Sequence, residues 1–277
     1  MARMAAETQI IDGPAAESLD DPWAVAPTFE ITDNEYLLRL PSGVRFHYRK
    51  GLGVRLHRPE GASDQEVKLF FDGSVYGAIA YLNGLIPLHA SAVIQDGAVR
   101  AFTAKSGGGK STLVAGLLSR DFRLFSDDVL LLDISDPEQI WCLPGHKKLK
   151  LWDDAVALTG AAAGDQVRPE LQKFFIDAEE ISCREPAPLA DLYQLDEAKQ
   201  EQTGISDVSG TRRFAIVRRA MYRPRFAKAL FDNLTMFETV SNISKLVRVR
   251  QFQRAMLKEH YWENLDLLIS DIRGAHG

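Results

Sequence analysis

The sequence is poor in cysteine and has no long uninterrupted hydrophobic run. Among 277 residues only Cys142 and Cys183 are cysteines, and their spacing is not that of a paired motif. We therefore expect neither a disulfide framework nor a zinc site, and a reducing cytoplasm as the location. Residues 1–23 lack a basic start followed by an apolar core, which argues against a secretory signal. The longest apolar stretch, 75–93, is interrupted by glycine, asparagine, proline and histidine, so it predicts a buried helix, a turn and a strand and no membrane contact.

Charge is unevenly distributed along the chain. The formal net charge is −5, whereas residues 211–260 contain twelve Lys or Arg and three Asp or Glu. Such a segment is compatible with an anionic partner or with a solvated helical face. Nucleic acid is not the expected partner, because the whole chain is acidic and no known nucleic-acid-binding module is visible. The sequence does not indicate an oligomeric state.

The most informative stretch runs from Ala101 to Leu113. Its three consecutive glycines and Lys-Ser-Thr follow an apolar segment and precede an apolar helical pattern. Strand, tight loop and helix is the context that a phosphate-binding loop requires. The glycines allow successive backbone N–H groups to face one anion, and the helix N-terminus adds its dipole. An ordinary glycine-rich turn is the alternative.

We expect this loop to bind a nucleotide, with Lys110 on the β and γ phosphates and the Ser111 hydroxyl on Mg²⁺. One position departs from the usual G-x-x-x-x-G-K-[ST] pattern, because Ala104 replaces the first glycine. Alanine is the smallest replacement, so we expect a slightly altered loop that still functions. The expected nucleotide-binding residues are Lys105, Ser106, Gly107, Gly108, Gly109, Lys110, Ser111 and Thr112.

Two carboxylates, Asp127 and Asp128, lie between two apolar strand-like segments downstream of the loop. An aspartate near a phosphate-binding loop commonly holds Mg²⁺, and a second one that stays off the metal can accept a proton. An Asp-Asp turn that only caps the next element is the structural alternative. His89 precedes the loop strand within an apolar run, where a buried structural histidine is the commoner role.

The pattern of elements predicts an α/β protein with a mobile tail (1–27), an N-terminal antiparallel β-rich subdomain with a helix (28–86), and a larger domain (87–277). Short alternating segments separated by turn residues favour the antiparallel sheet, and apolar residues at helical spacing predict a helix over 64–83. Residues 165–185 and 196–210 are expected to be loop and linker. The last third is expected to be mostly helical, over 212–222, 225–240 and 254–272, with a short segment at 246–251.

The segments 88–93, 105–112 and 124–129 together resemble the catalytic core of the HPr serine kinase/phosphorylase family. Segments 144–152 and 188–195 are also similar to HPr-kinase-like enzymes that phosphorylate a serine of lasso-peptide precursors. The resemblance implies a P-loop core of the HPr kinase and phosphoenolpyruvate carboxykinase type with a helical C-terminal part. It implies Mg²⁺ and ATP as cofactors and a serine of a ribosomally made peptide as the acceptor.

By that resemblance, Asp127 with His89 is the catalytic base, and Asp128 with Ser111 holds the metal. Lys150, Arg212 and Arg213 are candidates for contact with substrate or phosphate. The chain lacks the Glu-Ile-Arg-Gly type segment of true HPr kinases, which makes HPr itself and the reverse phosphorolysis doubtful. The His-Arg-Asp and Asp-Phe-Gly motifs of the usual protein kinases are not found.

Three alternatives stay open. A transport ATPase of the ABC type would share the loop, but a Leu-Ser-Gly-Gly-Gln-like motif and a downstream strand ending in Asp-Glu are not found. A nucleotide-binding regulatory protein that no longer transfers phosphate is favoured by Ala104. A small-metabolite kinase is also compatible, because no residue pattern identifies the acceptor.

Overall fold

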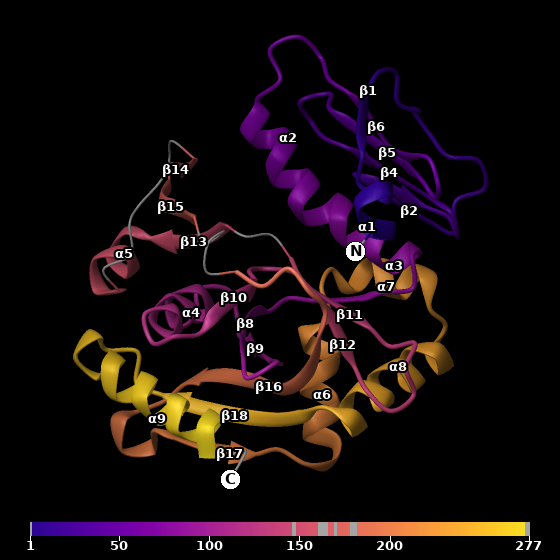
Figure 1. Cartoon of the computed structure of the whole chain (residues 1–277). Coiled ribbons are helices and arrows are strands. Elements are labelled where there is room, and N and C mark those ends of the chain that lie inside the picture. The colour runs from indigo at the N-terminus through magenta and orange to yellow at the C-terminus, as the bar shows by residue number, and fades with distance from the viewer. Residues whose placement is uncertain (1, 146–147, 160–165, 169–170, 178–181, 275–277) are drawn as a thin grey trace. The chain divides into compact units, whose positions relative to one another are not determined.

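The structure is a computed structural model that describes residues 2–145, 148–159, 166–168, 171–177 and 182–274. The chain forms two compact units, Met1–Pro87 with Met221–Thr239, and Leu88–Ala220 with Val240–Gly277. Both contain helices and strands, so the fold is mixed α/β (Figure 1). Within the described part of the chain, no helix is both long and apolar enough to cross a membrane.

The first unit contains a six-stranded sheet in the order β1-β6-β5-β4-β3-β2. Neighbouring strands are antiparallel except β1 and β6, which are parallel. Its strands are β1 (Ile10–Asp12), β2 (Ala24–Ala26), β3 (Phe29–Ile31), β4 (Glu35–Arg39), β5 (Arg45–Arg49) and β6 (Gly53–His57). Its helices are α1 (Ala2–Glu7), α2 (Asp64–Phe70), the π-helical η1 (Phe71–Val75), α3 (Tyr76–Leu82) and α7 (Pro224–Leu230).

Alternation in the sequence explains the strands of this sheet. In β5, Phe46 and Tyr48 are fully buried, whereas their neighbours are partly or wholly exposed. Side chains of successive strand residues point to opposite faces, so one face packs inward. Strands β3 to β6 therefore form an antiparallel sheet, as the alternating segments predict.

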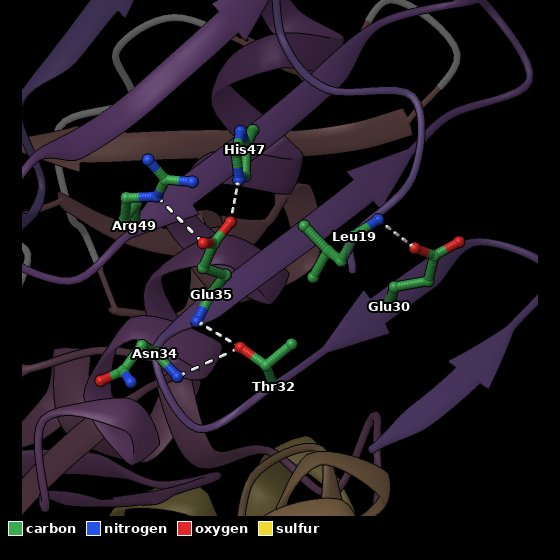
Figure 2. Close-up of polar contacts among 7 residues, drawn as sticks. All are labelled: Leu19, Glu30, Thr32, Asn34, Glu35, His47 and Arg49. Atoms are coloured by element: carbon green, nitrogen blue, oxygen red, sulfur yellow. Dashed lines mark hydrogen bonds and ion pairs between the residues drawn. The ribbon is translucent and has the colours of Figure 1, made fainter. Parts of the chain in front are cut away.

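Residues 2–27, which the sequence predicts to be a mobile tail, contain two strands that pair with the sheet of the first unit. Strand β1 pairs with β6 over Ile10–Asp12, and β2 pairs with β3. The backbone N–H of Leu19 donates to the buried Glu30 carboxylate over 2.6 Å (Figure 2). Burial by itself would raise the pKa of Glu30, but the Leu19 N–H and the Arg39 guanidinium lower it overall. The composition of the segment gave no sign of these long-range contacts.

Polar contacts also fix the β3–β4 and β4–β5 connections of this unit (Figure 2). The Thr32 hydroxyl accepts hydrogen bonds from the backbone N–H groups of Asn34 and Glu35. The Glu35 carboxylate in turn contacts His47 Nε2 over 2.6 Å and Arg49 Nε over 3.0 Å. These contacts tie the turn after β3 to β5, so they support the antiparallel register of the sheet.

The second unit is built on a sheet in the order β10-β8-β9-β16-β12-β11, and β18 pairs with β16 and with β17. The chain enters this unit through β7 (Ile86–Leu88). The other strands are β8 (Ser91–Gln95), β9 (Ala98–Thr103), β10 (Arg123–Ser126), β11 (Leu130–Asp133), β12 (Trp141–Leu143), β16 (Ala187–Glu197), β17 (Gly204–Asp207) and β18 (Arg248–Arg254). A small separate sheet contains β13 (Lys148–Trp152), β14 (Gln166–Arg168) and β15 (Leu171–Asp177).

Among the described residues, five α-helices and two short 3₁₀ helices lie wholly or partly in the second unit. Helix α4 is apolar on most sides and is buried over Leu113–Leu117, as expected for a helix packed on several neighbours. It contacts β8, α9 and the small sheet. The set is α4 (Lys110–Leu118), α5 (Asp153–Thr159), α6 (Gly210–Ala220), η2 (Gln200–Gln202), α8 (Asn233–Leu246), η3 (Lys258–His260) and α9 (Tyr261–Gly274).

Strand β16 lies between β9 and β18 and is parallel to both (Figure 1). Gln194 pairs with Thr103 of β9 and with Gln251 of β18. Because parallel strands end at the same edge, the loops after β9 and after β18 leave the sheet together. This edge is where the glycine-rich loop begins.

The sequence prediction was wrong about the strand β18. Residues 246–251 were expected to form a short segment before a helix starting at 254, but β18 runs through Arg254 and α9 begins at Tyr261. Its charged and amide residues hide the strand pattern, because Arg250, Gln251 and Arg254 are buried. Their burial depends on partners from other parts of the chain, which local alternation does not reveal.

Other boundaries differ from the expectation in the same way. Strands β14 and β15 lie in the expected loop 165–185, and β17 lies in the expected linker 196–210. The single helix expected over 225–240 is two helices, α7 and α8, with Phe231 in an extended conformation after α7. Residues 221–239 group with the first unit, although the sequence assigned them to the larger domain.

Helix α4 and helix α9 approach each other at a glycine. A Cβ atom on Gly116 would lie 2.1 Å from the Tyr261 hydroxyl oxygen, and that hydroxyl donates to the Thr112 carbonyl over 2.8 Å. We expect Gly116→Ala to lower the free energy of unfolding by about 1–3 kcal/mol, the usual cost of overpacking. In an exposed helix the same change would stabilise by about 1 kcal/mol.

The control is Gly274→Ala in α9, where a Cβ would meet no atom within 4 Å. Thermal unfolding should show a lower Tm for Gly116→Ala, a Tm near wild type for the control, and partial recovery when Tyr261→Phe is added. A raised Tm for Gly116→Ala would contradict this packing.

Candidate functional site

The loop between β9 and α4 has the backbone geometry of an anion cradle. Gly107 and Gly109 have φ values of +79° and +72°, in the left-handed region that favours glycine. A Cβ on Gly108 would lie 2.7 Å from the Ala104 Cβ, so the middle position needs glycine because alanine occupies 104. Helix α4 begins immediately afterwards at Lys110. The altered first position is therefore accommodated within the loop.

A cavity of about 290 Å³ opens beside this loop. One side is formed by the residues expected to bind a nucleotide, from Ser106 to Thr112. The opposite sides bring in groups from β7–β8, β10–β11, α5 and the segment after β18. The lining residues outside the loop are His89, Ser91, Asp127, Asp128, Leu158, Arg254, Ala255, Met256, Leu257, Lys258, Tyr261 and Asn264. The structure thus brings His89, both aspartates and Lys110 to one cavity.

Lys110 and Asp128 lie on the two sides of the His89 ring. Lys110 Nζ is 3.0 Å from His89 Nε2, and His89 Nδ1 is 3.2 Å from the Asp128 carbonyl oxygen and 3.3 Å from its Oδ1. An ammonium group only donates hydrogen bonds, so Nε2 accepts and Nδ1 carries the proton that faces Asp128. Contacts at both ring nitrogens thus fix the orientation of the His89 side chain.

Three-residue turns position Asp128 and His89, and of these two residues only Asp128 has a positive φ. Asp128 has φ +71°, and the N–H of Val129 donates to the Asp127 carbonyl over 2.9 Å, which closes a three-residue turn. Turns of this kind with a positive central φ are rare and strained. The N–H of Ala90 donates to the Leu88 carbonyl over 3.0 Å, which places His89 at the centre of a second three-residue turn, and the His89 N–H donates to the Ala220 carbonyl over 2.6 Å. The backbone strain at Asp128 is of the kind that is concentrated at functional sites.

Asp127 is held differently from its neighbour. Its Oδ1 accepts hydrogen bonds from Ser91 Oγ over 2.6 Å and from Ser111 Oγ over 3.2 Å. Only 6% of Asp127 is exposed, whereas the Asp128 side chain is 43% exposed. The buried carboxylate therefore lies beside the serine of the loop, and the exposed one lies beside the histidine.

The side-chain oxygen atoms of Ser111 and Asp127 are suitable ligands for a Mg²⁺ ion that also binds phosphates. Among the described residues, no cluster of three or more His, Cys, Asp or Glu side chains could hold a metal ion. Mg²⁺ in nucleotide sites usually takes one or two protein oxygens and completes its shell with phosphate and water. The Ser111 hydroxyl and the Asp127 carboxylate, which share a hydrogen bond, are oxygen ligands of that kind.

The three residues expected to contact substrate or phosphate lie outside the cavity or have side chains outside the described residues. The Lys150 side chain lies outside the described residues, although its backbone belongs to β13. Arg212 donates to the Gln251 amide oxygen over 2.6 Å, and Arg213 is half-buried on α6. In the part of the chain that the structure describes, neither arginine lines the cavity with Lys110.

Ser91, Arg254 and Tyr261 are among the cavity residues that the sequence reasoning missed. Ser91 belongs to the same short motif as His89, so its position two residues later was the available signal. Burial raises the pKa of Tyr261 well above its ordinary value, so its hydroxyl stays protonated as a donor to Thr112. The only signal for Arg254 was the basic excess over 211–260.

Comparisons with known proteins give little further information. No protein-family model matches the chain, and no curated protein matches it. Among solved structures, the chain is similar to the HPr(Ser) kinase/phosphatase from Coxiella burnetii, with 11% sequence identity and a TM-score of 0.37. The match covers 69% of this chain and 99% of the other.

Proposed function

We propose that the chain is an ATP-dependent kinase that transfers the γ-phosphoryl group to a serine hydroxyl of a peptide. The observation that carries this proposal is the meeting of Lys110, His89 and both aspartates at one glycine-rich loop. A protein that only stored a nucleotide would need the loop and Lys110, but it would not need an imidazole and an exposed carboxylate beside them. The sequence resemblance to precursor-peptide kinases supports a ribosomally made, lasso-type peptide as the substrate class.

Phosphoryl transfer depends mainly on positioning and charge neutralisation. The bond between the γ-phosphorus and its bridging oxygen breaks, a bond to the serine oxygen forms, and the hydroxyl proton needs an acceptor. We infer that Lys110 and the loop N–H groups bind the phosphates. Once the ammonium contacts phosphate, His89 Nε2 no longer accepts from it and is available toward the acceptor hydroxyl.

We infer that Asp127 is the metal ligand and Asp128 the proton acceptor, which reverses the roles that the family resemblance implies. Asp127 is hydrogen-bonded to Ser111, so it is the carboxylate suited to share Mg²⁺ with that hydroxyl. Bound there, the metal would neutralise phosphate charge. Asp128 is more exposed and adjoins His89, so it is suited to accept the proton with the histidine.

The variants Asp127→Asn and Asp128→Asn test this division directly. We expect Asp127→Asn to raise the Mg²⁺ concentration needed for half-maximal turnover by at least tenfold, because a metal ligand loses its charge. Asp128→Asn should lower kcat about 10²–10⁴-fold, the usual contribution of a general base, with an unchanged Mg²⁺ requirement. Steady-state assays over a Mg²⁺ series measure both, and the reverse pattern would restore Asp127 as the base.

Nucleotide binding is tested separately with Lys110→Met. Removing a charged hydrogen-bond donor costs about 1.5–3 kcal/mol, so we expect ATP to bind about 10–150-fold more weakly. Lys245→Met, which removes an exposed lysine of α8, is the matched control and should bind ATP like wild type. Titration calorimetry measures both, and equal affinities for Lys110→Met and wild type would exclude the loop as the phosphate site.

Peptide transfer itself is tested by mass spectrometry after incubation with ATP, Mg²⁺ and peptides that carry one serine near the C-terminus. We expect a mass increase of one phosphoryl group that is absent when that serine is alanine. ATP binding without any phosphorylated peptide would favour the regulatory nucleotide-binding protein. Transfer only to small hydroxyl compounds would favour a metabolite kinase.

A further inference from the structure

Arg254 lies beneath the glycine-rich loop as the last residue of β18. Only 4% of it is exposed, and its Nη2 donates to the Gly108 carbonyl over 2.9 Å. Its guanidinium stacks over the Phe252 ring, with 5.8 Å between Cζ and the ring centroid. A Cβ on Gly109 would lie 2.8 Å from Nη2, so the loop has no side chain where the guanidinium sits. Loop and arginine are thus packed against each other.

The guanidinium has no carboxylate to balance its charge within the described part of the chain. The other two arginines of β18 do have one, since Arg248 pairs with Asp191 over 2.6 Å and Arg250 pairs with Asp271. The Arg254 Nε is buried without a hydrogen-bond partner among the described residues. Burial lowers the pKa of Arg254 to about 10, which still leaves it charged at neutral pH. Burying an unpaired charge is energetically unfavourable, so the Arg254 guanidinium needs an anion as its partner.

The position of Arg254 indicates which anion that is. Arg254 lines the cavity that contains Lys110 and Asp127, and it also lines a second cavity of about 510 Å³ on the Lys105–Gly108 side of the loop. Glu197 is its register partner on β16, but that side chain is exposed and makes no ion pair with it in the described structure. Guanidinium groups bind phosphate oxygens with two parallel hydrogen bonds.

We propose that Arg254 is a phosphate-binding residue of the nucleotide site and that the bound phosphate supplies its missing counter-charge. The inference rests on the proposed function only in that phosphate binds the loop. By donating to the Gly108 carbonyl, Arg254 also holds the backbone of the loop in place. Arg254 is thus both a ligand of phosphate and a positioning residue for the loop.

The test uses Arg254→Met, Arg254→Lys and the exposed control Arg273→Met, with inorganic pyrophosphate as the probe. Without ligand, we expect Arg254→Met to have a Tm equal to or above that of wild type, because it removes an unbalanced buried charge. Its affinity for pyrophosphate should fall at least tenfold. Arg254→Lys should recover part of that loss, and the control should bind like wild type. Titration calorimetry and ligand-free thermal unfolding give the two readouts.

Two results would overturn the inference. One is that Arg254→Met lowers the Tm measured without ligand but leaves the affinity for pyrophosphate unchanged. Arg254 would then have only a structural role. The other is a wild-type protein that binds no pyrophosphate, which would remove the proposed function as well. Wild-type protein that binds pyrophosphate through Arg254 but never phosphorylates a peptide would contradict the proposed function alone.

Discussion

The parallel pairing of β16 with both β9 and β18 is the constraint on which the candidate site depends. Because the three strands end at the same edge, the loop after Thr103 and the segment after Arg254 meet there, although about 150 residues of chain separate them. The glycine-rich loop supplies backbone N–H groups, and β18 supplies a buried guanidinium. Neither segment could form this cavity alone.

The site contains side chains of both charges. Lys110 and Arg254 adjoin the glycines, whereas the Asp128 side chain is 43% exposed and contacts His89. Asp127 lies between these groups and is held by two serine hydroxyls. In the proposed function, the cations beside the loop bind the phosphates, Ser111 and Asp127 hold the metal, and His89 with Asp128 accepts the proton of the acceptor hydroxyl.

The sequence predicted the parts of the site that are encoded in short stretches of chain. The loop from Gly107 to Thr112 was predicted because glycine, lysine and serine must occur there in a fixed order. The prediction that His89 lies near the aspartates came from the family resemblance and not from residue spacing. The structure brings these residues to one cavity. The roles of Asp127 and Asp128 could not be separated, because only the fold shows that Ser91 and Ser111 contact one of them.

Residues whose burial depends on distant partners were not predictable. Strand β18 was missed because its arginines suggest an exposed surface, whereas Arg248 and Arg250 are balanced by Asp191 and Asp271 from other elements. The N-terminal segment was expected to be mobile because its alanine, proline and acidic residues carry no local pattern. Its pairing with β6 and its contact with Glu30 arise only in the folded unit.

The central claim is that the triphosphate of ATP lies in the glycine-rich loop between Lys110 and Arg254, with His89 and Asp128 facing its terminal phosphate. A crystal structure with Mg²⁺ and a non-hydrolysable ATP analogue tests this claim most directly. We expect the γ-phosphate to contact Lys110, with the ammonium withdrawn from His89 Nε2 and the metal beside Ser111 and Asp127. An analogue bound away from the loop, or phosphates that leave His89 and Asp128 facing only protein, would contradict it.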